Sequence, residues 1–581
     1  MPPFFAAALA MALLGALALS PASALARSQQ TAPLDGRQGS PSTDASTGRA
    51  LVSAGAYGPV VPIPSTLWKP AAGAVPASGD YVYLKSDAGD FVDPGKSFLY
   101  TRTNAVLTVS ASGGLLTVGV QGDKHWNGDF ATMSSITDLE PGYYPNVEEY
   151  PSNDPTCGSL NWSGDGRGVG TLTGWFAVDK VTYDNGDLTA ITLRFELHPG
   201  GHTPALHGAI HWQADDTTEP PGPRLPIPGS LWQPAAGVVP TSGNYAYLES
   251  DPGEYIGAGR AYLYTPANAA FSIHENGAYF TITLDCSEQW EGEFHVMAPL
   301  TEIGPGYYPG LETMPGNPAK GDLLWGGDGR GDGGTGWFAV DDVAYTDGAP
   351  TTLDLRFEQG TGAGQPALHG VVHWDAATTQ SQTATTLTLR APAVSAFRSA
   401  RLSGTLTDAG AQPVAGATVT IRSTTGGPWT TVGTVTTNAS GRYGFTATPT
   451  VINAYQAVFA GADTEAGSVS APVATLPKVY LSKPSAPRSA RAGAAIKCFC
   501  YLKPHHANGK YAVLFEFERR VSRRWVVEGA VKAKAATYRG YSKCSARVRL
   551  PVQGWWRVRA VHPEDSLNAA TLGAWRAIKI T

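Results

Sequence analysis

Two histidine–glutamate pairs are the residues best suited to acid–base chemistry in this chain of 581 residues. His207 with Glu196, and His369 with Glu358, each lie in a predicted β-strand or at its end. A hydrolase would also need a nucleophile or a metal beside such a pair. The chain has no H-E-x-x-H, no G-x-S-x-G and no Cys/His spacing typical of zinc. The sequence therefore predicts no enzyme, no cofactor and no metal, with a secreted hydrolase as a minor alternative.

Two glycine-rich loops of the form G-D-G-R-G offer one acid and one base each. They could be ligand or Ca²⁺ loops, but Ca²⁺ takes several oxygen ligands and each loop has one carboxylate. We expect instead a β-turn with positive φ, in which the arginine pairs with Glu196 or Glu358. The candidate ligand-binding residues of these loops are Asp165, Arg167, Asp328 and Arg330.

Tryptophan and tyrosine recur at matching places in two parts of the chain. Exposed aromatic rings can bind sugars, but aromatic residues more often fill cores. Four tyrosines lie between Pro-Gly and Pro, which predicts loops and exposed contacts. These are Tyr143, Tyr144, Tyr307 and Tyr308. A carbohydrate-binding accessory protein is therefore the first alternative function.

The elements that carry these residues are repeated. Pro64 to Trp212 returns as Pro228 to Trp374 at an offset of about 163 residues, which indicates tandem modules at 59–215 and 224–375. Short alternating strands without helical periodicity predict an all-β fold, with β-sandwich or jelly-roll-like modules. Two linked modules favour a binding role, because linked weak sites gain avidity.

The chain ends indicate export. Residues 1–26 have the apolar run and Ala-x-Ala sites of a secretory signal peptide, and 27–58 have the composition of a disordered leader. No later stretch is long and apolar enough to span a membrane. We therefore expect an extracellular protein, secreted or associated with the cell surface, whose role is non-catalytic binding.

Residues 384–477 resemble bacterial Ig-like and carboxypeptidase-regulatory-like sandwiches, through Pro413 to Ile421 and Thr437 to Phe445. Residues 478–581 resemble an Ig-like module common in secreted actinobacterial proteins, through Tyr501 to His506 and Trp556 to Ala560. Both resemblances imply Ig-like β-sandwiches.

The repeated modules resemble an uncharacterised domain of secreted bacterial proteins. The residues that carry the match in the second copy are Gly327 to Gly331, Phe357-Glu358-Gln359 and Pro366 to Gly370, with counterparts in the first copy. This family implies no activity that can be transferred.

The last domain is strongly basic. Residues 478–581 hold 21 Lys and Arg against 5 Asp and Glu, whereas the whole chain has a net charge of −6. This imbalance predicts an anionic cell-wall polymer or polysaccharide as partner, with a basic but inert domain that only keeps the module soluble as the alternative, and nothing predicts nucleic acid. The arginines expected to form the charged surface are Arg519, Arg520, Arg523, Arg524, Arg547, Arg549, Arg557 and Arg559.

Five cysteines cannot all pair. Cys157 and Cys286 lie at non-equivalent places in the two modules and are expected to be free. Cys498 and Cys500 share one side of a strand, so neither bonds easily to the other. The sequence predicts a disulfide from Cys544 to Cys498 or Cys500, with three buried thiols as the alternative.

Overall fold

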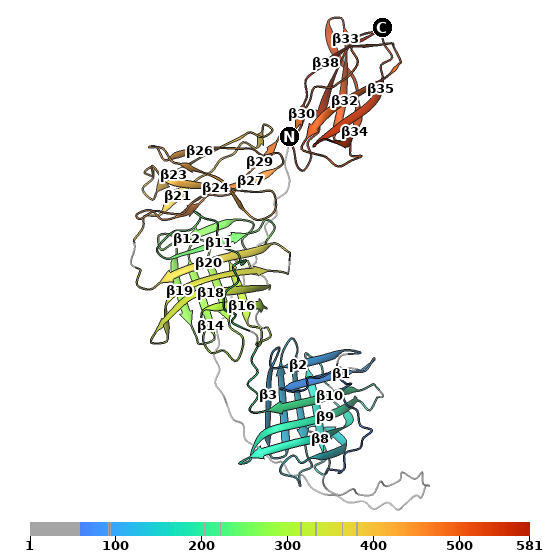
Figure 1. Ribbon diagram of the computed structural model, residues 1–581, viewed down its shortest axis with the longest axis vertical. Coiled ribbons are helices and arrows are strands. Elements are labelled where there is room, and N and C mark those ends of the chain that lie inside the picture. The colour runs from blue at the N-terminus through green and yellow to red at the C-terminus, as the bar shows by residue number, and fades with distance from the viewer. Residues whose placement is uncertain are drawn as a thin grey trace, which may run out of the picture. The chain divides into compact units, whose positions relative to one another are not determined.

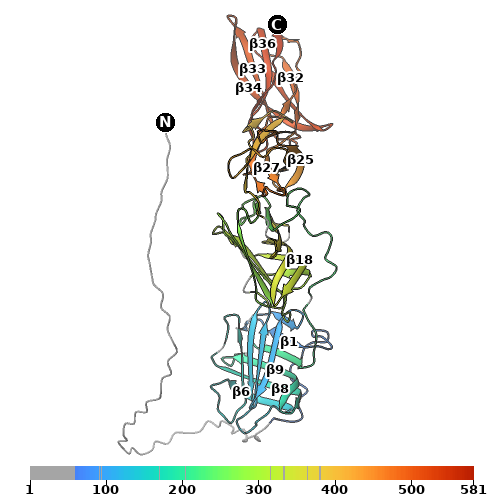
Figure 2. The same ribbon diagram turned by 90° about the vertical axis from the view of Figure 1, so that its left-hand side faces the viewer.

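The computed structural model describes residues 59–581, apart from positions 91, 93, 169, 203, 221, 314–315, 332–333, 363 and 379–380. The predicted signal peptide and leader lie outside these residues. All regular elements in the described part are β-strands, which confirms the all-β prediction (Figures 1 and 2). Among the same residues, no helix is long and apolar enough to cross a membrane.

The first module forms two packed layers whose strands are joined in one continuous pairing order, β2-β1-β10-β9-β8-β6-β7-β5-β4-β3. Strand β6 belongs to both layers, because it pairs antiparallel with β8 and parallel with β7. The strands are β1 (Tyr81–Ser86), β2 (Ser97–Thr101), β3 (Val106–Ser112), β4 (Leu115–Gln121), β5 (His125–Ala131), β6 (Gly142–Glu149), β7 (Ser159–Gly164), β8 (Leu172–Asp184), β9 (Asp187–Pro199) and β10 (Leu206–Gln213).

The second module repeats this arrangement as two sheets, β12-β11-β20-β19-β18-β16 and β13-β14-β15-β17. The strands are β11 (Tyr245–Ser250), β12 (Ala261–Tyr264), β13 (Ala270–Glu275), β14 (Tyr279–Asp285), β15 (Trp290–His295), β16 (Gly306–Leu311), β17 (Asp322–Gly327), β18 (Thr335–Thr346), β19 (Ala349–Gly360) and β20 (Ala367–Asp375).

The repeated aromatic residues fill the space between the layers. Trp126 and Trp162 are fully buried with Phe195 in the first module, and their counterparts are buried in the second. Glycine on the neighbouring strands makes this packing possible. A Cβ on Gly208 would lie 2.0 Å from the Phe195 ring, and one on Gly128 would lie 2.3 Å from the Trp162 ring. These tryptophans are therefore core residues and are not available to a sugar.

The third part of the chain forms a 3-stranded and a 6-stranded sheet. Its short β22 pairs in parallel with its last strand, β29. The strands are β21 (Thr385–Leu387), β22 (Val394–Ser395), β23 (Ala400–Asp408), β24 (Thr418–Thr424), β25 (Thr430–Thr436), β26 (Arg442–Ala447), β27 (Asn453–Phe459), β28 (Ser468–Val469) and β29 (Val473–Pro477).

The basic last domain is built around β34, which pairs with β33 along one half and with β35 along the other. Its first strands include β31, which pairs in parallel with the final strand, β38. The strands are β30 (Tyr480–Leu481), β31 (Ser489–Ala490), β32 (Ala495–Lys503), β33 (Val513–Val521), β34 (Arg524–Tyr538), β35 (Tyr541–Arg549), β36 (Gly554–His562), β37 (Thr571–Leu572) and β38 (Arg576–Ile580).

All five cysteines are free thiols in this structure. Cys498 and Cys500 are both buried, and Cys544 is the direct register partner of Cys500 on the adjacent strand. A disulfide from Cys544 to Cys498 or Cys500 stays a prediction. Mass spectrometry of a non-reducing digest tests it, and a peptide linking Cys157 to Cys286 would contradict the prediction that these two cysteines are free.

Candidate functional site

The predicted histidine–glutamate pair of the first module lies on the outer face of the sheet that contains β8, β9 and β10. His207 and Glu196 face each other across β10 and β9, with 3.0 Å between the imidazole Nδ1 and a carboxylate oxygen. On the other side of the ring, Nε2 lies 3.4 Å from Asp87. His198 also lies 3.1 Å from Glu196. The imidazole therefore has a carboxylate at each nitrogen.

A tryptophan covers this histidine. The ring of Trp68 stacks on His207 with 4.9 Å between centroids, and the side chain of His207 is only 12% exposed. Arg194 holds the covering segment in place, because it donates to the Trp68 carbonyl at 2.7 Å and binds Asp179 through two further hydrogen bonds. The segment that precedes β1 is thus fixed across the sheet.

The second module repeats the arrangement. His369 lies 3.3 Å from Glu358 and 3.7 Å from Asp251, and Trp232 stacks on its ring at 5.1 Å. Arg356 donates to the Trp232 carbonyl at 3.0 Å. The sequence predicted the histidines and glutamates, but it missed the aspartates and the covering tryptophans, although all of them are repeated.

The charges in these clusters are strongly stabilised. The pKa of Glu196 falls to about 2, chiefly because the imidazole of His207 lies 3.0 Å from its carboxylate, with His198 and Trp175 adding to the effect. Burial alone would lower the pKa of His369, but the nearby carboxylates of Asp251 and Glu358 outweigh it and raise the pKa to about 9. His369 therefore carries the positive charge of its ion cluster, and among the described residues no Ser, Cys or Thr is bonded to either histidine.

Two of the four predicted surface tyrosines are not at the surface. Tyr144 and Tyr308 are 1% and 0% exposed, and each stacks on a core phenylalanine at 4.4 Å. The loop prediction was wrong because the Tyr-Tyr pairs lie in β6 and β16, where alternate side chains face inward. Tyr143 and Tyr307 point the other way and are half-buried, with their rings edge-on to Trp175 and Trp337.

The glycine-rich loops are the turns that the sequence predicted. Asp165 and Asp328 have φ of 51° and 52°, the next glycine is also at positive φ, and the flanking residues pair as a hairpin. The predicted bonds from the arginines to Glu196 and Glu358 were wrong. Arg167 and Arg330 pair instead with the aspartate of their own turn, because the glutamates face the histidines.

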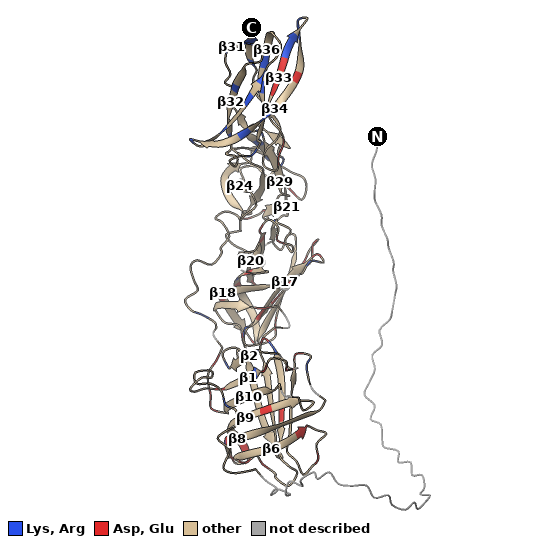
Figure 3. Ribbon diagram, turned by 90° about the vertical axis from the view of Figure 1, so that its right-hand side faces the viewer, with Lys and Arg blue, Asp and Glu red and all other residues tan. Residues whose placement is uncertain are grey.

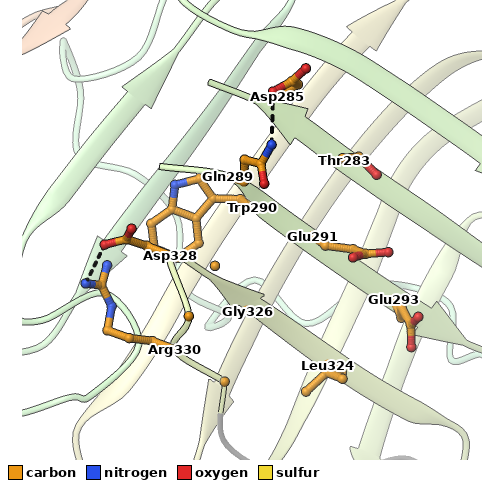
Figure 4. Close-up of a pocket in the computed structure, with 13 residues that line it drawn as sticks. Thr283, Asp285, Gln289, Trp290, Glu291, Glu293, Leu324, Gly326, Asp328 and Arg330 are labelled. Atoms are coloured by element: carbon orange, nitrogen blue, oxygen red, sulfur yellow. Dashed lines mark hydrogen bonds and ion pairs between the residues drawn. The ribbon is translucent and has the colours of Figure 1, made fainter. Parts of the chain in front are cut away.

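An open groove of about 830 Å³ lies beside the second of these turns. Figure 4 shows Glu291 and Glu293 on its floor, and Asp328 held by Arg330 at its rim. The carboxylates do not converge on one point: among the described residues no metal-binding group of His, Cys, Asp or Glu includes them. The groove therefore presents an acidic surface of the second module.

The second module is joined to the third part of the chain by a buried polar cluster. Arg422 on β24 is 1% exposed and binds both Tyr247 and Glu249 on β11. The Tyr247 hydroxyl in turn donates to Glu249 at 2.9 Å. Val458 packs among the apolar residues around this cluster. We call this surface of the second module the β11–β12 face, formed by Trp232, Tyr247, Glu249, Ala261 and Leu263.

The same surface of the first module is open. We call it the β1–β2 face, formed by Trp68, Tyr83, Lys85, Ser97 and Leu99, which occupy the corresponding positions. Lys85, Ser97 and Leu99 are exposed, and Trp68 and Tyr83 are half-buried. The rings of Trp68 and Tyr83 are nearly parallel, 6° apart, with 6.4 Å between centroids. Aromatic surface and one cation are therefore presented together.

The basic residues of the last domain gather on its strands, as predicted (Figure 3), but they do not form one continuous patch. Arg547 and Arg549 lie on β35 beside β32, whereas Arg557 and Arg559 lie on β36 beside β33. The patch that was predicted to extend along two strands is interrupted, because β34 and β33 lie between β35 and β36. Arg519, Arg557 and Arg559 form ion pairs with three glutamates. Arg520, Arg523 and Arg524 are exposed at the β33–β34 turn.

Comparison with known proteins adds little to these observations. No family model and no curated protein matches the chain. One similar solved structure is the native conformation of E. coli alpha-2-macroglobulin, at 11% identity and a TM-score of 0.18, covering 87% of this chain and 38% of that one. Another is the FN1–FN3 region of chicken CNTN1, at 12% identity and a TM-score of 0.16, covering 54% of this chain and 99% of that one. These scores support no argument, and the all-β class rests on the strands of the chain itself.

Proposed function

We propose that this chain is an exported, non-catalytic binding protein that acts at the cell surface and uses the β1–β2 face of its first module as a binding site. The observation that carries this proposal is the difference between two equivalent surfaces. The β11–β12 face is covered by the neighbouring Ig-like part of the chain, whereas the β1–β2 face leaves Lys85 and Leu99 exposed. A surface that packs in one copy and is open in the other is available to a ligand.

The chemistry of the β1–β2 face suits a polysaccharide with negative charge. Tyr83 and Trp68 offer aromatic surface to the apolar side of a sugar ring, and Lys85 on the same strand as Tyr83 offers a cation. The ion cluster beneath Trp68 supports this use, because it holds the tryptophan in one orientation. The same cluster argues against hydrolysis, since carboxylates lie at both nitrogens of His207.

The test is a binding screen of the mature chain against glycans and cell-wall polysaccharides. We expect Tyr83→Ala and Lys85→Ala each to weaken binding by roughly tenfold, the loss of about 1.4 kcal/mol. Tyr511→Ala in the last domain is the matched control, because that tyrosine is 53% exposed and remote in sequence. Wild-type binding by the Tyr83→Ala protein, or no glycan bound by any variant, would exclude this site.

The basic last domain supports a second contact, attachment to an anionic wall polymer. Arg547 is exposed and lies opposite Lys497 on β32, so positive charge is concentrated there. Attachment by charge must weaken as salt shortens the screening length, about 8 Å near physiological ionic strength. We expect the mature chain to bind the polymer in low salt and to release it by roughly 0.5 M.

The control for this contact removes the same charge elsewhere. Arg547→Gln with Arg549→Gln should reduce retention on the polymer, whereas Arg390→Gln with Arg401→Gln, both exposed in the preceding part of the chain, should change it little. Binding that is independent of salt, or equal losses in the two double variants, contradicts attachment through the last domain.

A further inference from the structure

Three side chains of the last domain direct their ligand atoms at one point. His506 follows β32, His562 ends β36, and Asp565 lies in the loop after β36. One atom from each, two imidazole nitrogens and a carboxylate oxygen, lie within 4.8 Å of one another. Asp565 Oδ2 lies 3.3 Å from His506 Nε2 and 3.7 Å from His562 Nε2.

Both imidazoles are oriented from behind by backbone carbonyls. His562 Nδ1 lies 2.8 Å from the Ala512 oxygen, and His506 Nδ1 lies 2.9 Å from the Pro504 oxygen. A carbonyl can only accept, so each Nδ1 carries the proton and donates. In the neutral rings both Nε2 atoms therefore present lone pairs to the carboxylate. Histidines that bind a metal have this pattern, with the outer nitrogen donating to a carbonyl or carboxylate.

The buried histidine lacks a partner for its inner nitrogen. His562 is 1% exposed, and its Nε2 makes no hydrogen bond. At 3.7 Å the Asp565 oxygen is beyond hydrogen-bonding distance. A buried nitrogen without a partner is costly, and a cation between the three atoms would satisfy it.

Asp565 is prepared for the same role. Its Oδ1 accepts from the backbone N–H groups of Leu567 and Asn568 at 2.9 and 2.8 Å, which leaves Oδ2 directed at the histidines. Its side chain is 36% exposed, so the site is open to water on this side.

From this geometry we propose that His506, His562 and Asp565 form a binding site for a divalent transition metal of the zinc type. Two imidazoles and one carboxylate suit Zn²⁺, with water as the fourth ligand. At zinc–ligand distances of about 2.1 Å, ligand atoms in a tetrahedron lie about 3.4 Å apart. The contacts to Asp565 are near this separation already, so small side-chain rotations complete the site.

The metal would stabilise the joint with the preceding Ig-like part. The loop that carries Asp565 also contacts that part: Asn568 donates to the Thr450 carbonyl at 2.8 Å, and Ile452 donates to the Leu567 carbonyl at 2.8 Å. Because Asp565 accepts from Leu567 and Asn568, fixing its carboxylate fixes the residues that make these contacts. Zn²⁺ would thus order the loop between the two Ig-like parts of the chain.

The experiment measures Zn²⁺ binding to the mature full chain by competition with a chromogenic chelator, and its thermal stability with Zn²⁺ and with EDTA. We expect Zn²⁺ to bind the chain at one site and to raise its unfolding temperature. His506→Gln and Asp565→Asn should each weaken Zn²⁺ binding by roughly 100-fold. Loss of a group that only orients a metal ligand already weakens binding by up to about that factor, and these substitutions remove a ligand itself. His505→Gln is the matched control, since the adjacent histidine faces Thr537 instead.

A second measurement excludes the cysteines as ligands. Cys500 and Cys544 are free in this structure, and thiolates also bind zinc. The Co²⁺-loaded chain should show weak visible bands without a sulfur-to-metal charge-transfer band. The proposal is overturned if the wild type does not bind Zn²⁺ or if the Co²⁺-loaded chain shows a sulfur charge-transfer band. It is also overturned if Asp565→Asn keeps wild-type affinity and circular dichroism, or if His505→Gln loses as much affinity as the two ligand variants.

Discussion

The two modules have matching cores but different outer surfaces. Buried tryptophans, the phenylalanines that pack on them and the glycines that make room for the rings lie at equivalent positions in both. On the outer face, by contrast, Glu249 replaces Lys85, and Val371 replaces Ala209. A closely packed core restricts substitution, because even one added methyl group clashes. The exposed face has no such restriction, so two copies of one fold can have different partners.

The largest expected difference between the two faces is in how much the free energy of unfolding falls when one charged side chain is removed. Glu249→Ala leaves Arg422 buried without its carboxylate, and loss of one member of a buried ion pair costs about 3–5 kcal/mol. Lys85→Ala, at the same position of the open face, should cost less than about 0.5 kcal/mol. Chemical denaturation of the mature chain measures both. Equal effects would mean that the two faces are in the same environment.

The two ion clusters should make the stability of the chain depend on pH in two ways, through His369 at alkaline pH and through Glu196 at acid pH. The pKa of His369 is about 9 in the folded chain against 6.5 ordinarily, so its stabilisation is complete below pH 6.5 and is lost as the pH rises through 9. The size is of order 3 kcal/mol. The pKa of Glu196 is about 2 against 4.5, so its stabilisation is present above pH 4.5 and is lost as the pH falls through 2.

Unfolding curves across pH check this prediction. His369→Asn should flatten the alkaline limb and leave the acid limb, whereas Glu196→Gln should flatten the acid limb. An alkaline limb left unchanged by His369→Asn, or an acid limb left unchanged by Glu196→Gln, would contradict this prediction.

The smallest expected difference in stability comes from removing one tyrosine hydroxyl group from each face. Tyr247→Phe removes a buried group that accepts from Arg422 and donates to Glu249, at a cost of about 1–3 kcal/mol. Tyr83→Phe, in the half-buried counterpart, should change the free energy of unfolding by less than about 0.5 kcal/mol. Calorimetry of the two variants compares them directly, and a larger effect at Tyr83 would reverse the assignment of open and covered faces.

The features that depend on local sequence could be predicted. Asp-Gly at a hairpin turn needs positive φ, and Asp165 adopts it. The alternation of apolar and polar residues correctly indicated that the elements are β-strands. Tyr144 was misplaced because Pro and Gly around a Tyr-Tyr pair indicate a loop, whereas bulge formation in β6 lets a strand continue through them.

The features that depend on long-range contacts could not be predicted. Arg422 and Glu249 are 173 residues apart in the chain, and His506 and Asp565 are 59 apart. No periodicity or spacing connects such residues, since their approach depends on how sheets pack and where loops return. The aspartates that flank His207 and His369 were missed for the same reason, because Asp87 lies far from β10 in sequence.

The parallel pairs at the borders of the two Ig-like parts have a mechanical consequence. β22 pairs with β29, and β31 pairs with β38, so in each case a strand near the start lies parallel to the last one. Tension applied to the two ends pulls such strands past each other, and all hydrogen bonds between them carry the load together. An antiparallel pair pulled from one end would instead open one bond at a time. Both of these parts of the chain are therefore connected in a way that resists tension applied to their ends.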